Sequence, residues 1–310
     1  MRVLITGISG FVGSHLAEYL LGKDEVHGIK RWRSPLDNIS HIQDNITLHD
    51  CDLTDLSAVI SVLMVVKPDR IYHLAAQSYV PFSYSNPIQT LQTNVIGTAN
   101  LLEAVRLTDQ QPLIHICSSS EVYGQPDYVP MDEKLPLNPI SPYGVSKVAE
   151  DRLGFAYYKA YGMKCVITRM FTHTGPRRGD VFFESSFARQ VVAVEKGKCD
   201  TIYVGNLKSV RTISDVRDAV RAYSMLNDSM AGEAYNIGGN ATLRVGDVLD
   251  RLMAMAKVSP KVVVDPARLR PADVTNQIPD CTKFKQSTGW EPRIPLDETL
   301  QSLLDYWRSR

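Results

Sequence analysis

The stretch Arg2-Val3-Leu4-Ile5-Thr6-Gly7-Ile8-Ser9-Gly10-Phe11-Val12-Gly13 decides the fold. Its apolar run 3–5 predicts a short buried strand, and the glycine turn that follows opens a helix expected over 15–21. Glycine lets the backbone turn tightly and approach a phosphate, whose charge then lies on the free amides at the positive end of the helix. The spacing Gly7-x-x-Gly10-x-x-Gly13 in this context therefore predicts a dinucleotide-binding turn.

Short apolar runs alternate with longer amphipathic stretches through the first half of the chain. This rhythm predicts an α/β fold with a Rossmann-type doubly wound parallel sheet. The expected strands are 26–29, 46–49, 70–74, 113–117 and 165–169, and the expected helices are 57–66, 90–107 and 143–161. The rhythm loosens after about Phe171, and segment 234–237 is expected to return to the sheet.

We therefore expect two units. Residues 1–172 form the cofactor-binding Rossmann domain, with returning elements near 207–238 and 282–300. Residues 173–310 form mainly a smaller, interleaved C-terminal lobe that binds substrate.

Bulk composition excludes several classes of protein. Lys and Arg total 34 against 34 Asp and Glu, so no net charge attracts nucleic acid or an anionic membrane. The longest apolar run, 58–66, is shorter than the ~20 residues of a membrane span, and the N-terminus differs from a signal peptide. We expect a cytoplasmic protein. The cysteines are odd in number and lack a Cys-x-x-Cys pair, so neither disulfides nor a metal site is expected: Cys51, Cys117, Cys165, Cys199 and Cys281.

The end of the second strand indicates which nicotinamide cofactor fits. An acidic residue there accepts a hydrogen bond from a ribose 2′-OH but repels a 2′-phosphate. This chain carries Arg31 and Arg33, followed by Ser34, so NADP is favoured over NAD. A solvated basic turn is the alternative. Asp52 and Leu53, after the third strand, are expected to flank the adenine, although Asp-Leu is also a common strand exit.

Tyr143 and Lys147 are four residues apart and so share one helical face. Ser141 can cap this helix and Pro142 suits its first turn, which places Tyr143 near the positive helix end. The dipole and the ammonium both favour a phenolate, so we expect Tyr143 to act as an acid/base near neutral pH while Lys147 reaches the cofactor ribose. A pair on a surface helix is the alternative, but the preceding dinucleotide turn favours a catalytic role.

Ser119 and Glu121 follow the fifth strand, at the edge where open α/β sheets form their crevice. Ser119 is expected to hydrogen-bond a sugar hydroxyl or keto oxygen beside Tyr143. Oxidation of an alcohol needs only Tyr, Lys and Ser. An added carboxylate can abstract an acidic C–H proton next to the resulting ketone. A carboxylate that caps the following turn is the other interpretation of Glu121.

Several motifs together resemble the extended short-chain dehydrogenases/reductases that act on nucleotide sugars, across essentially the whole chain. They are the glycine turn, His73-Leu74-Ala75-Ala76, Asn94-Val95-Ile96-Gly97-Thr98, Ser118-Ser119-Ser120-Glu121-Val122-Tyr123-Gly124, Tyr143-Gly144-Val145-Ser146-Lys147 and Thr288-Gly289-Trp290. Segments 25–31 and 175–180 look like the GDP-mannose 4,6-dehydratases. Segment 287–296 looks equally like the GDP-4-keto-6-deoxymannose reductases.

The resemblance implies a set of roles. In a dehydratase, Tyr143 takes the C4 hydroxyl proton, Glu121 removes the C5 proton and water leaves from C6, with no net consumption of NADP. In a reductase, the same Tyr143 acts as acid and one NADPH is consumed. Arg211 and Arg270 would hold the substrate diphosphate. The remaining implied cofactor contacts are Gly7, Gly10, Phe11, Val12, Gly13, Leu74, Ala75 and Ala76, and the remaining substrate contacts are Ser78, Ser120, Thr172, Arg178 and Asn206. A homodimer or homotetramer through helices 90–107 and 143–161 is also implied.

Two positions depart from the family pattern. Thr172 stands where the family usually has Asn, and Thr212-Ile213 where an Asp and an aromatic are usual. Ser119, Glu121, Tyr143 and Lys147 are all retained, which argues against a lapsed site. We expect a nucleotide-sugar 4,6-dehydratase acting on GDP-mannose or a related GDP-sugar. A reductase of the 4-keto sugar is the first alternative, and an NADP-binding regulatory protein with a lapsed site is the second.

Overall fold

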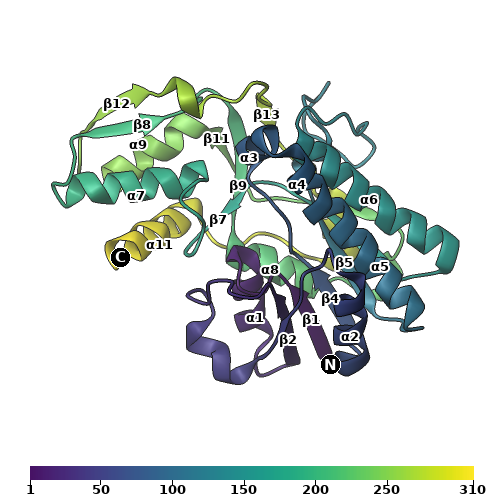
Figure 1. The fold of residues 1–310 in the computed structure, drawn as a ribbon. Helices are drawn as coiled ribbons and strands as arrows, with labels where there is room; N and C mark the ends of the chain where they lie inside the picture. The colour runs from purple at the N-terminus through teal and green to yellow at the C-terminus, as the bar shows by residue number, and fades with distance from the viewer.

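A seven-stranded, all-parallel sheet forms the centre of the protein in the computed structural model, which describes residues 1–310 (Figure 1). Its strand order is β10 (Ala234–Ile237), β6 (Cys165–Met170), β5 (Leu113–Ser119), β4 (Arg70–His73), β1 (Arg2–Thr6), β2 (Glu25–Lys30) and β3 (Thr47–Asp50). The chain reverses direction of winding between β1 and β4, the place where doubly wound sheets open a crevice. The predicted fold class is confirmed, including the return of 234–237 to the sheet beside β6.

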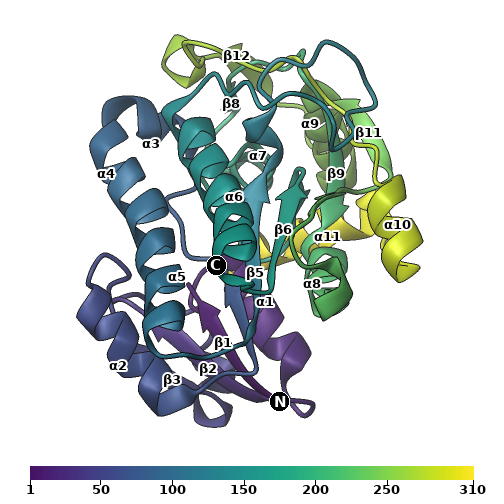
Figure 2. The same ribbon diagram turned by 90° about the vertical axis from the view of Figure 1, so that its right-hand side faces the viewer.

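Helices cover both faces of this sheet because its strands alternate between two apolar faces. Val3 and Ile5 belong to the core beneath α1 (Phe11–Leu20) and α8 (Val216–Ser224). Leu4 belongs to the opposite core, beneath α2 (Leu56–Val66) and α5 (Gly97–Leu107). The helix α6 (Pro142–Tyr161) lies beside α5, as Figure 2 shows. No helix combines the length and the apolar character that crossing a bilayer requires.

The predicted helix 90–107 begins earlier and contains a π-helical turn. It runs from α4 (Pro87–Leu91) through η2 (Gln92–Ile96) into α5. Within η2, the Asn94 amide donates to the carbonyl of Gln77 at 3.0 Å and to the Ser146 hydroxyl at 2.8 Å. The Asn94 carbonyl oxygen accepts from the Gln77 amide at 2.7 Å. This residue thereby ties the segment after β4 to the helix that carries Tyr143.

A second lobe packs over the carboxyl ends of the strands. Its sheets pair β9 (Val210–Asp215) with β7 (His173–Thr174), β11 (Ala241–Arg244) and β13 (Asn276–Gln277), and β8 (Thr201–Val204) with β12 (Lys261–Val264). Its core lies between α7 (Phe183–Glu195), α9 (Val245–Ala256) and α11 (Leu296–Arg308). Shorter helices are η1 (Ser40–Asn45), α3 (Val80–Ser85), η3 (Ser120–Val122), η4 (Asp228–Met230), η5 (Pro266–Arg268) and α10 (Thr282–Thr288).

The two units interleave along the chain. Within 207–238, α8 and β10 join the large sheet whereas β9 belongs to the smaller one. Within 282–300, Phe284 and Trp290 pack into the core under the large sheet. The division at residue 172 stays a prediction.

Candidate active site

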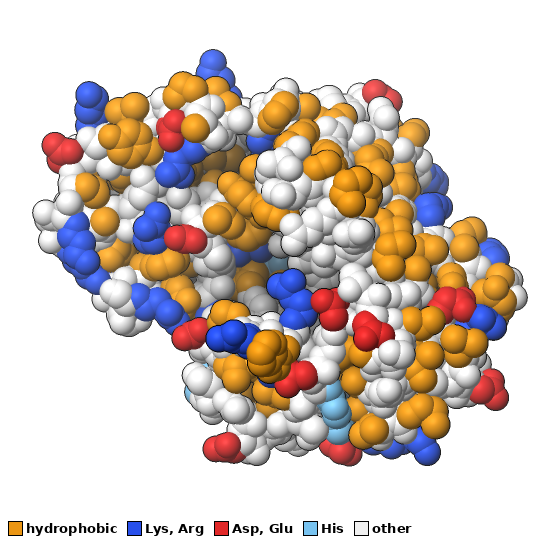
Figure 3. All heavy atoms as spheres, viewed as in Figure 1, with side chains coloured by type: hydrophobic (Ala, Val, Ile, Leu, Met, Phe, Trp, Pro, Cys, Tyr) orange, Lys and Arg blue, Asp and Glu red, His pale blue; other side chains and the backbone are white.

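A cavity of about 1240 Å³ lies between the carboxyl ends of the strands and the second lobe. Figure 3 shows it as a hollow between the two parts of the molecule, with Lys and Arg side chains along it. It is lined by nearly all residues predicted for the site, whose roles stay predictions: Gly7, Gly10, Phe11, Val12, Gly13, Arg31, Asp52, Leu53, Leu74, Ala75, Ala76, Ser78, Ser119, Ser120, Glu121, Tyr143, Lys147, Thr172, Arg178, Asn206, Arg211 and Arg270.

Arg33 is the one predicted site residue outside the cavity lining. It is exposed, has a positive φ of 61°, and its guanidinium lies 5.3 Å from the ring centroid of Trp32. The turn therefore directs Arg31 toward the cavity and Arg33 along the surface, while Lys30 and Ser34 join Arg31 in the lining.

The glycine turn is built for close approach of a ligand. Gly7 has a φ of +71°, and a Cβ added there would lie 2.9 Å from the Cα of Ala75. A Cβ on Gly13 would lie 2.3 Å from the carbonyl oxygen of Gly7. Gly10 caps α1 without a side chain, so the amides of the first turn stay free for an anion. These features fit a dinucleotide pyrophosphate.

Two hydrogen-bonded side chains fix the neighbouring strand ends. The Thr6 hydroxyl accepts from the amides of Leu74 and Ala75, each at 3.1 Å, and contacts the Nδ1 of His73 at 2.9 Å. The Nε2 of His73 reaches the Thr98 hydroxyl at 2.8 Å on α5. The segment 74–76 is therefore held against the glycine turn. Asp52, at the adenine end predicted from the sequence, caps the amide of Thr54 at 2.9 Å.

Tyr143 and Lys147 occupy the first turns of α6, as predicted. The Ser141 hydroxyl caps the helix by accepting from the Gly144 amide at 3.0 Å. Tyr143 is buried, and the Nζ of Lys147 lies 5.9 Å from its ring centroid. Burial raises the pKa of the Tyr143 phenol, and Lys147 and Ser119 only partly oppose this rise. The expectation of an acidic phenol is therefore wrong, because the effect of desolvation on the pKa outweighs that of the ammonium.

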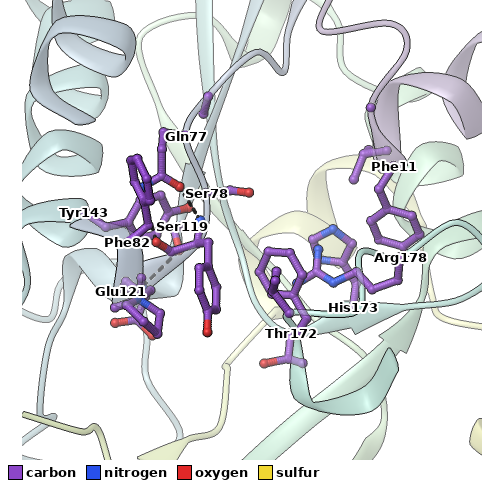
Figure 4. Close-up of a pocket in the computed structure, with 18 of the residues that line it drawn as sticks. Phe11, Gln77, Ser78, Phe82, Ser119, Glu121, Tyr143, Thr172, His173 and Arg178 are labelled. Atoms are coloured by element: carbon purple, nitrogen blue, oxygen red, sulfur yellow. Dashed lines mark hydrogen bonds between the residues drawn. The ribbon is translucent and has the colours of Figure 1, made fainter. Parts of the chain in front are cut away.

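Glu121 faces the cavity rather than acting as a cap. Ser119 is the residue that caps η3, accepting from the Glu121 amide at 3.2 Å. The Oε1 of Glu121 accepts from Gln277 at 3.3 Å and lies 3.5 Å from the Nη1 of Arg270. Figure 4 shows Glu121, Ser119 and Tyr143 on one wall of the pocket. A carboxylate, a hydroxyl and a phenol thus lie together at the end of β5 and the start of α6.

The two arginines predicted to hold a diphosphate differ in what they contact. Arg211 is buried and donates to the carbonyls of Val210 at 2.9 Å, Val274 at 2.9 Å and Thr275 at 3.4 Å, and to Asp273 at 3.5 Å. These contacts occupy four of the five N–H groups of a guanidinium. Arg270 is more exposed, and its charged partners are two carboxylates, those of Glu121 at 3.5 Å and Asp273 at 3.7 Å. Arg270 therefore has more donors free for an anion.

The opposite wall contains contacts that the sequence did not reveal. His173 stacks on Phe11 with ring centroids 5.7 Å apart (Figure 4), and the guanidinium of Arg178 lies 3.5 Å from the ring centroid of Phe182. Burial lowers the pKa of His173 to about 3, so its imidazole is neutral at working pH. Its Nε2 and the Nε of Arg178 are buried without a partner. His173 directly follows Thr172, so the sequence offered a position at which to look for it. Phe182 and Gln277 stand in no recognisable motif.

The two departures from the family pattern have different surroundings. Thr172 lines the cavity, and its carbonyl accepts from the Ser214 amide at 3.0 Å. Thr212 lies outside the cavity lining, where its hydroxyl contacts that of Thr242 at 2.8 Å on β11. Ile213 packs in the core of the second lobe. Only the change at Thr172 therefore bears directly on a ligand.

Comparison with known proteins supports this architecture. The family model described as GDP-mannose 4,6 dehydratase matches residues 4–303. A GDP-mannose 4,6-dehydratase of Yersinia enterocolitica is 34% identical, covering 96% of this chain and 91% of the relative. A GDP-6-deoxy-D-mannose reductase of Pseudomonas aeruginosa is 33% identical, covering 100% and 98%. The solved structure of RMD from Pseudomonas aeruginosa complexed with NADPH superposes with a TM-score of 0.86 at 31% identity, covering 100% of both chains. The chain belongs to the GDP-mannose 4,6-dehydratase family.

Proposed function

We propose that this chain is an NADP-dependent 4,6-dehydratase that converts GDP-mannose, or a closely related GDP-sugar, into the 4-keto-6-deoxy sugar. The observation that carries the proposal is the position of Glu121. Its carboxylate shares a cavity wall with Tyr143 and is held by residues of the second lobe. A simple reductase has no need of a base at this place, whereas elimination of water requires one.

The residues divide the chemistry between them. Tyr143 accepts the C4 hydroxyl proton as the alcohol is oxidised. The protonated phenol then polarises the 4-keto oxygen by a hydrogen bond, and Ser119 hydrogen-bonds the same oxygen. Glu121 removes the C5 proton, which the neighbouring ketone makes acidic, and delivers a proton to the departing C6 hydroxyl so that water leaves. Arg270 holds the diphosphate and so places C5 beside Glu121. The proton from C5 leaves in the water, and the proton taken from the C4 hydroxyl is the one that must reprotonate C5, so the net change is the loss of one water.

The glycine turn and Arg31 make the cofactor site suitable for NADP. A bound nicotinamide would supply acceptance of hydride from C4 and its return to C6. The chain's own part is to hold the pyrophosphate on the free amides after Gly10, and to meet a 2′-phosphate with Arg31 and Ser34. The relative solved with NADPH supports this choice.

A 4-keto sugar reductase is the second candidate, because the reductase relative is matched from end to end. Purified protein mixed with GDP-mannose separates the possibilities when product and absorbance at 340 nm are followed together. A 4-keto-6-deoxy product without net change of NADPH supports dehydration. Activity only on the keto sugar, with stoichiometric loss of NADPH, would replace dehydration by reduction. Inertness toward every nucleotide sugar, unaltered by Tyr143→Phe, would indicate a binding protein.

We also propose that the enzyme is a homodimer through α4, α5 and α6, and that it works in the cytoplasm. These helices lie side by side (Figure 2) and expose apolar residues: Ile88, Ile96, Val145, Phe155 and Tyr161. Light scattering of the eluted protein tests the assembly. A monomer at micromolar concentration would contradict it.

A further inference from the structure

A buried acid outside the cavity lining, Glu150, contacts Lys147. It lies one helical turn beyond Lys147 on α6 and is only 1% exposed. Its Oε2 accepts from the Nζ of Lys147 at 2.8 Å. The roles proposed above for Tyr143, Lys147, Ser119 and Glu121 make no use of this carboxylate.

The ammonium of Lys147 is held from two sides. Besides Glu150, it donates to the carbonyl of Cys117 at 2.9 Å, at the end of β5. Its remaining N–H can point toward the cavity, which Lys147 lines and Glu150 does not. The lysine is therefore fixed before any ligand binds.

Burial of Glu150 is costly, and the structure compensates for it only in part. Its second oxygen, Oε1, is buried without a hydrogen-bond partner. A half-satisfied buried carboxylate destabilises a fold compared with an apolar side chain of similar volume. Such a group beside a cleft is more readily explained by function than by stability.

Among the acids near Lys147, Glu150 is the one that pairs with it, because the other acid on this face is already paired. On α6, Asp151 is engaged by Arg169 of β6 at 2.8 Å. Tyr143 is the titratable group on α6 that faces this region. The titratable groups from other elements are Cys117 and His115 on β5 and His73 on β4. Burial lowers the pKa of both histidines to about 3, so neither carries charge near neutral pH.

We propose that Glu150 is a positioning residue, which fixes the ammonium of Lys147 and offsets the charge that this ammonium places beside Tyr143. The inference rests on the proposed function of Tyr143 as the acid/base. Glu150 touches neither the cavity nor Tyr143, and acts through Lys147 and through its own field.

Electrostatics at the site agree with this role. Burial raises the pKa of Glu150 to about 7, so the carboxylate is charged over the range in which a tyrosine titrates. Its charge raises the pKa of Tyr143, whereas Lys147 lowers it. Tyr143 and Glu150 are two helical turns apart, about 10 Å along the helix axis. At this distance one carboxylate charge shifts the pKa of a phenol by about one pH unit.

The test is the pH profile of kcat between pH 7 and about 11 for wild type and two charge-removing variants, Glu150→Gln and Glu150→Met. The first proton transfer needs a deprotonated Tyr143, so activity rises with pH. We expect the rising limb of both variants to move by about one pH unit toward lower pH. Glu150→Asp keeps the charge and should keep the limb in place. Glu195→Gln, the same substitution in the half-exposed pair with Arg308, is the matched control and should match wild type.

A limb that stays in place in both charge-removing variants, with only kcat reduced, would overturn the proposal in favour of a structural role. The second variant decides the outcome if the first does not fold.

A spectroscopic readout separates this inference from the proposed function. The titration of Tyr143 can be followed by NMR of protein carrying ¹³Cζ-tyrosine, with Tyr143→Phe identifying the signal and without any substrate. A Tyr143 signal that titrates about one pH unit lower in Glu150→Gln supports the inference even if GDP-mannose proves to be the wrong substrate. An unmoved signal overturns it even if the enzyme is a dehydratase.

Discussion

Replacing Arg211 by lysine tests whether this residue contributes more to the stability of the second lobe than to substrate binding. Its guanidinium donates to three backbone carbonyls, of Val210, Val274 and Thr275, from within the interior. A lysine ammonium cannot reach all three, so two carbonyls lose the guanidinium as a donor. Each buried acceptor left unpaired costs about 1–3 kcal/mol, so two would cost about 2–6 kcal/mol. We expect the lower part of this range, about 2–4 kcal/mol in the free energy of unfolding, because the Thr275 carbonyl keeps the Val210 amide as a donor at 2.7 Å.

This loss is measurable by calorimetry. For a chain of this length, 1 kcal/mol corresponds to about 1.5 °C, so the melting temperature should fall by about 3–6 °C. The same variant should raise the KM for the nucleotide sugar, because the loosened segment leads into β13, where Gln277 contacts Glu121. Arg244→Lys, in a pair where the arginine is 67% exposed, is the matched control and should melt with wild type.

Two outcomes would refute this reasoning. A melting temperature of Arg211→Lys equal to that of the control would mean that its carbonyl contacts contribute nothing. Alternatively, a large rise in KM with an unchanged melting temperature would make Arg211 a diphosphate ligand first and a structural residue second.

Three further predictions concern the chemistry, the cofactor and the stability. Glu121→Gln should still exchange hydride at C4 but should not eliminate water. Full turnover by this variant, measured as 4-keto-6-deoxy product, would remove Glu121 from the mechanism. Arg31→Ala should weaken NADPH binding about 10- to 100-fold, the value of a charge-assisted hydrogen bond, and leave NADH binding nearly unchanged. Equal losses for both cofactors in a fluorescence titration would show that Arg31 does not meet the 2′-phosphate. Burial lowers the pKa of four histidines to about 4 or about 3, namely His15, His73, His115 and His173. The unfolded chain binds these protons below about pH 6.5 and the folded chain does not, so each histidine removes up to about 1.4 kcal/mol of stability per pH unit as the pH falls from 6.5 toward 4. A melting temperature that stays level between pH 7 and 5 would contradict this.

The local sequence pattern predicted the strands and helices that position the site residues. The run 3–5 and the glycines after it fixed a strand and a helix start, and the carboxyl ends of parallel strands meet at one edge. Ser119 and the helix of Tyr143 therefore had to come together. The sequence could not show how deeply Tyr143 is buried, because burial depends on packing from the whole chain, and the predicted acidity of the phenol was wrong for this reason.

Contacts between segments that lie far apart in the chain could not be predicted from the sequence either. Gln277 reaches Glu121 across 156 positions, from a strand of only two residues. No periodicity marks so short a strand, and its place depends on pairing with β9. Arg33 shows the opposite case, where a residue of the expected type lies outside the cavity because its own φ of 61° turns the chain.

The contact between Arg270 and Glu121 links substrate recognition to the removal of the C5 proton. In the protein without ligands, the cation nearest the base is also the arginine proposed to hold the diphosphate. A diphosphate that binds Arg270 is a stronger partner than a single carboxylate at 3.5 Å, because it carries more charge and accepts bidentate hydrogen bonds. Its arrival would draw the guanidinium from Glu121 and leave the carboxylate with Gln277 as a neutral donor. Glu121 would therefore be released from this ion pair only once a nucleotide diphosphate fills the site, which protects the cavity from chemistry on free sugars.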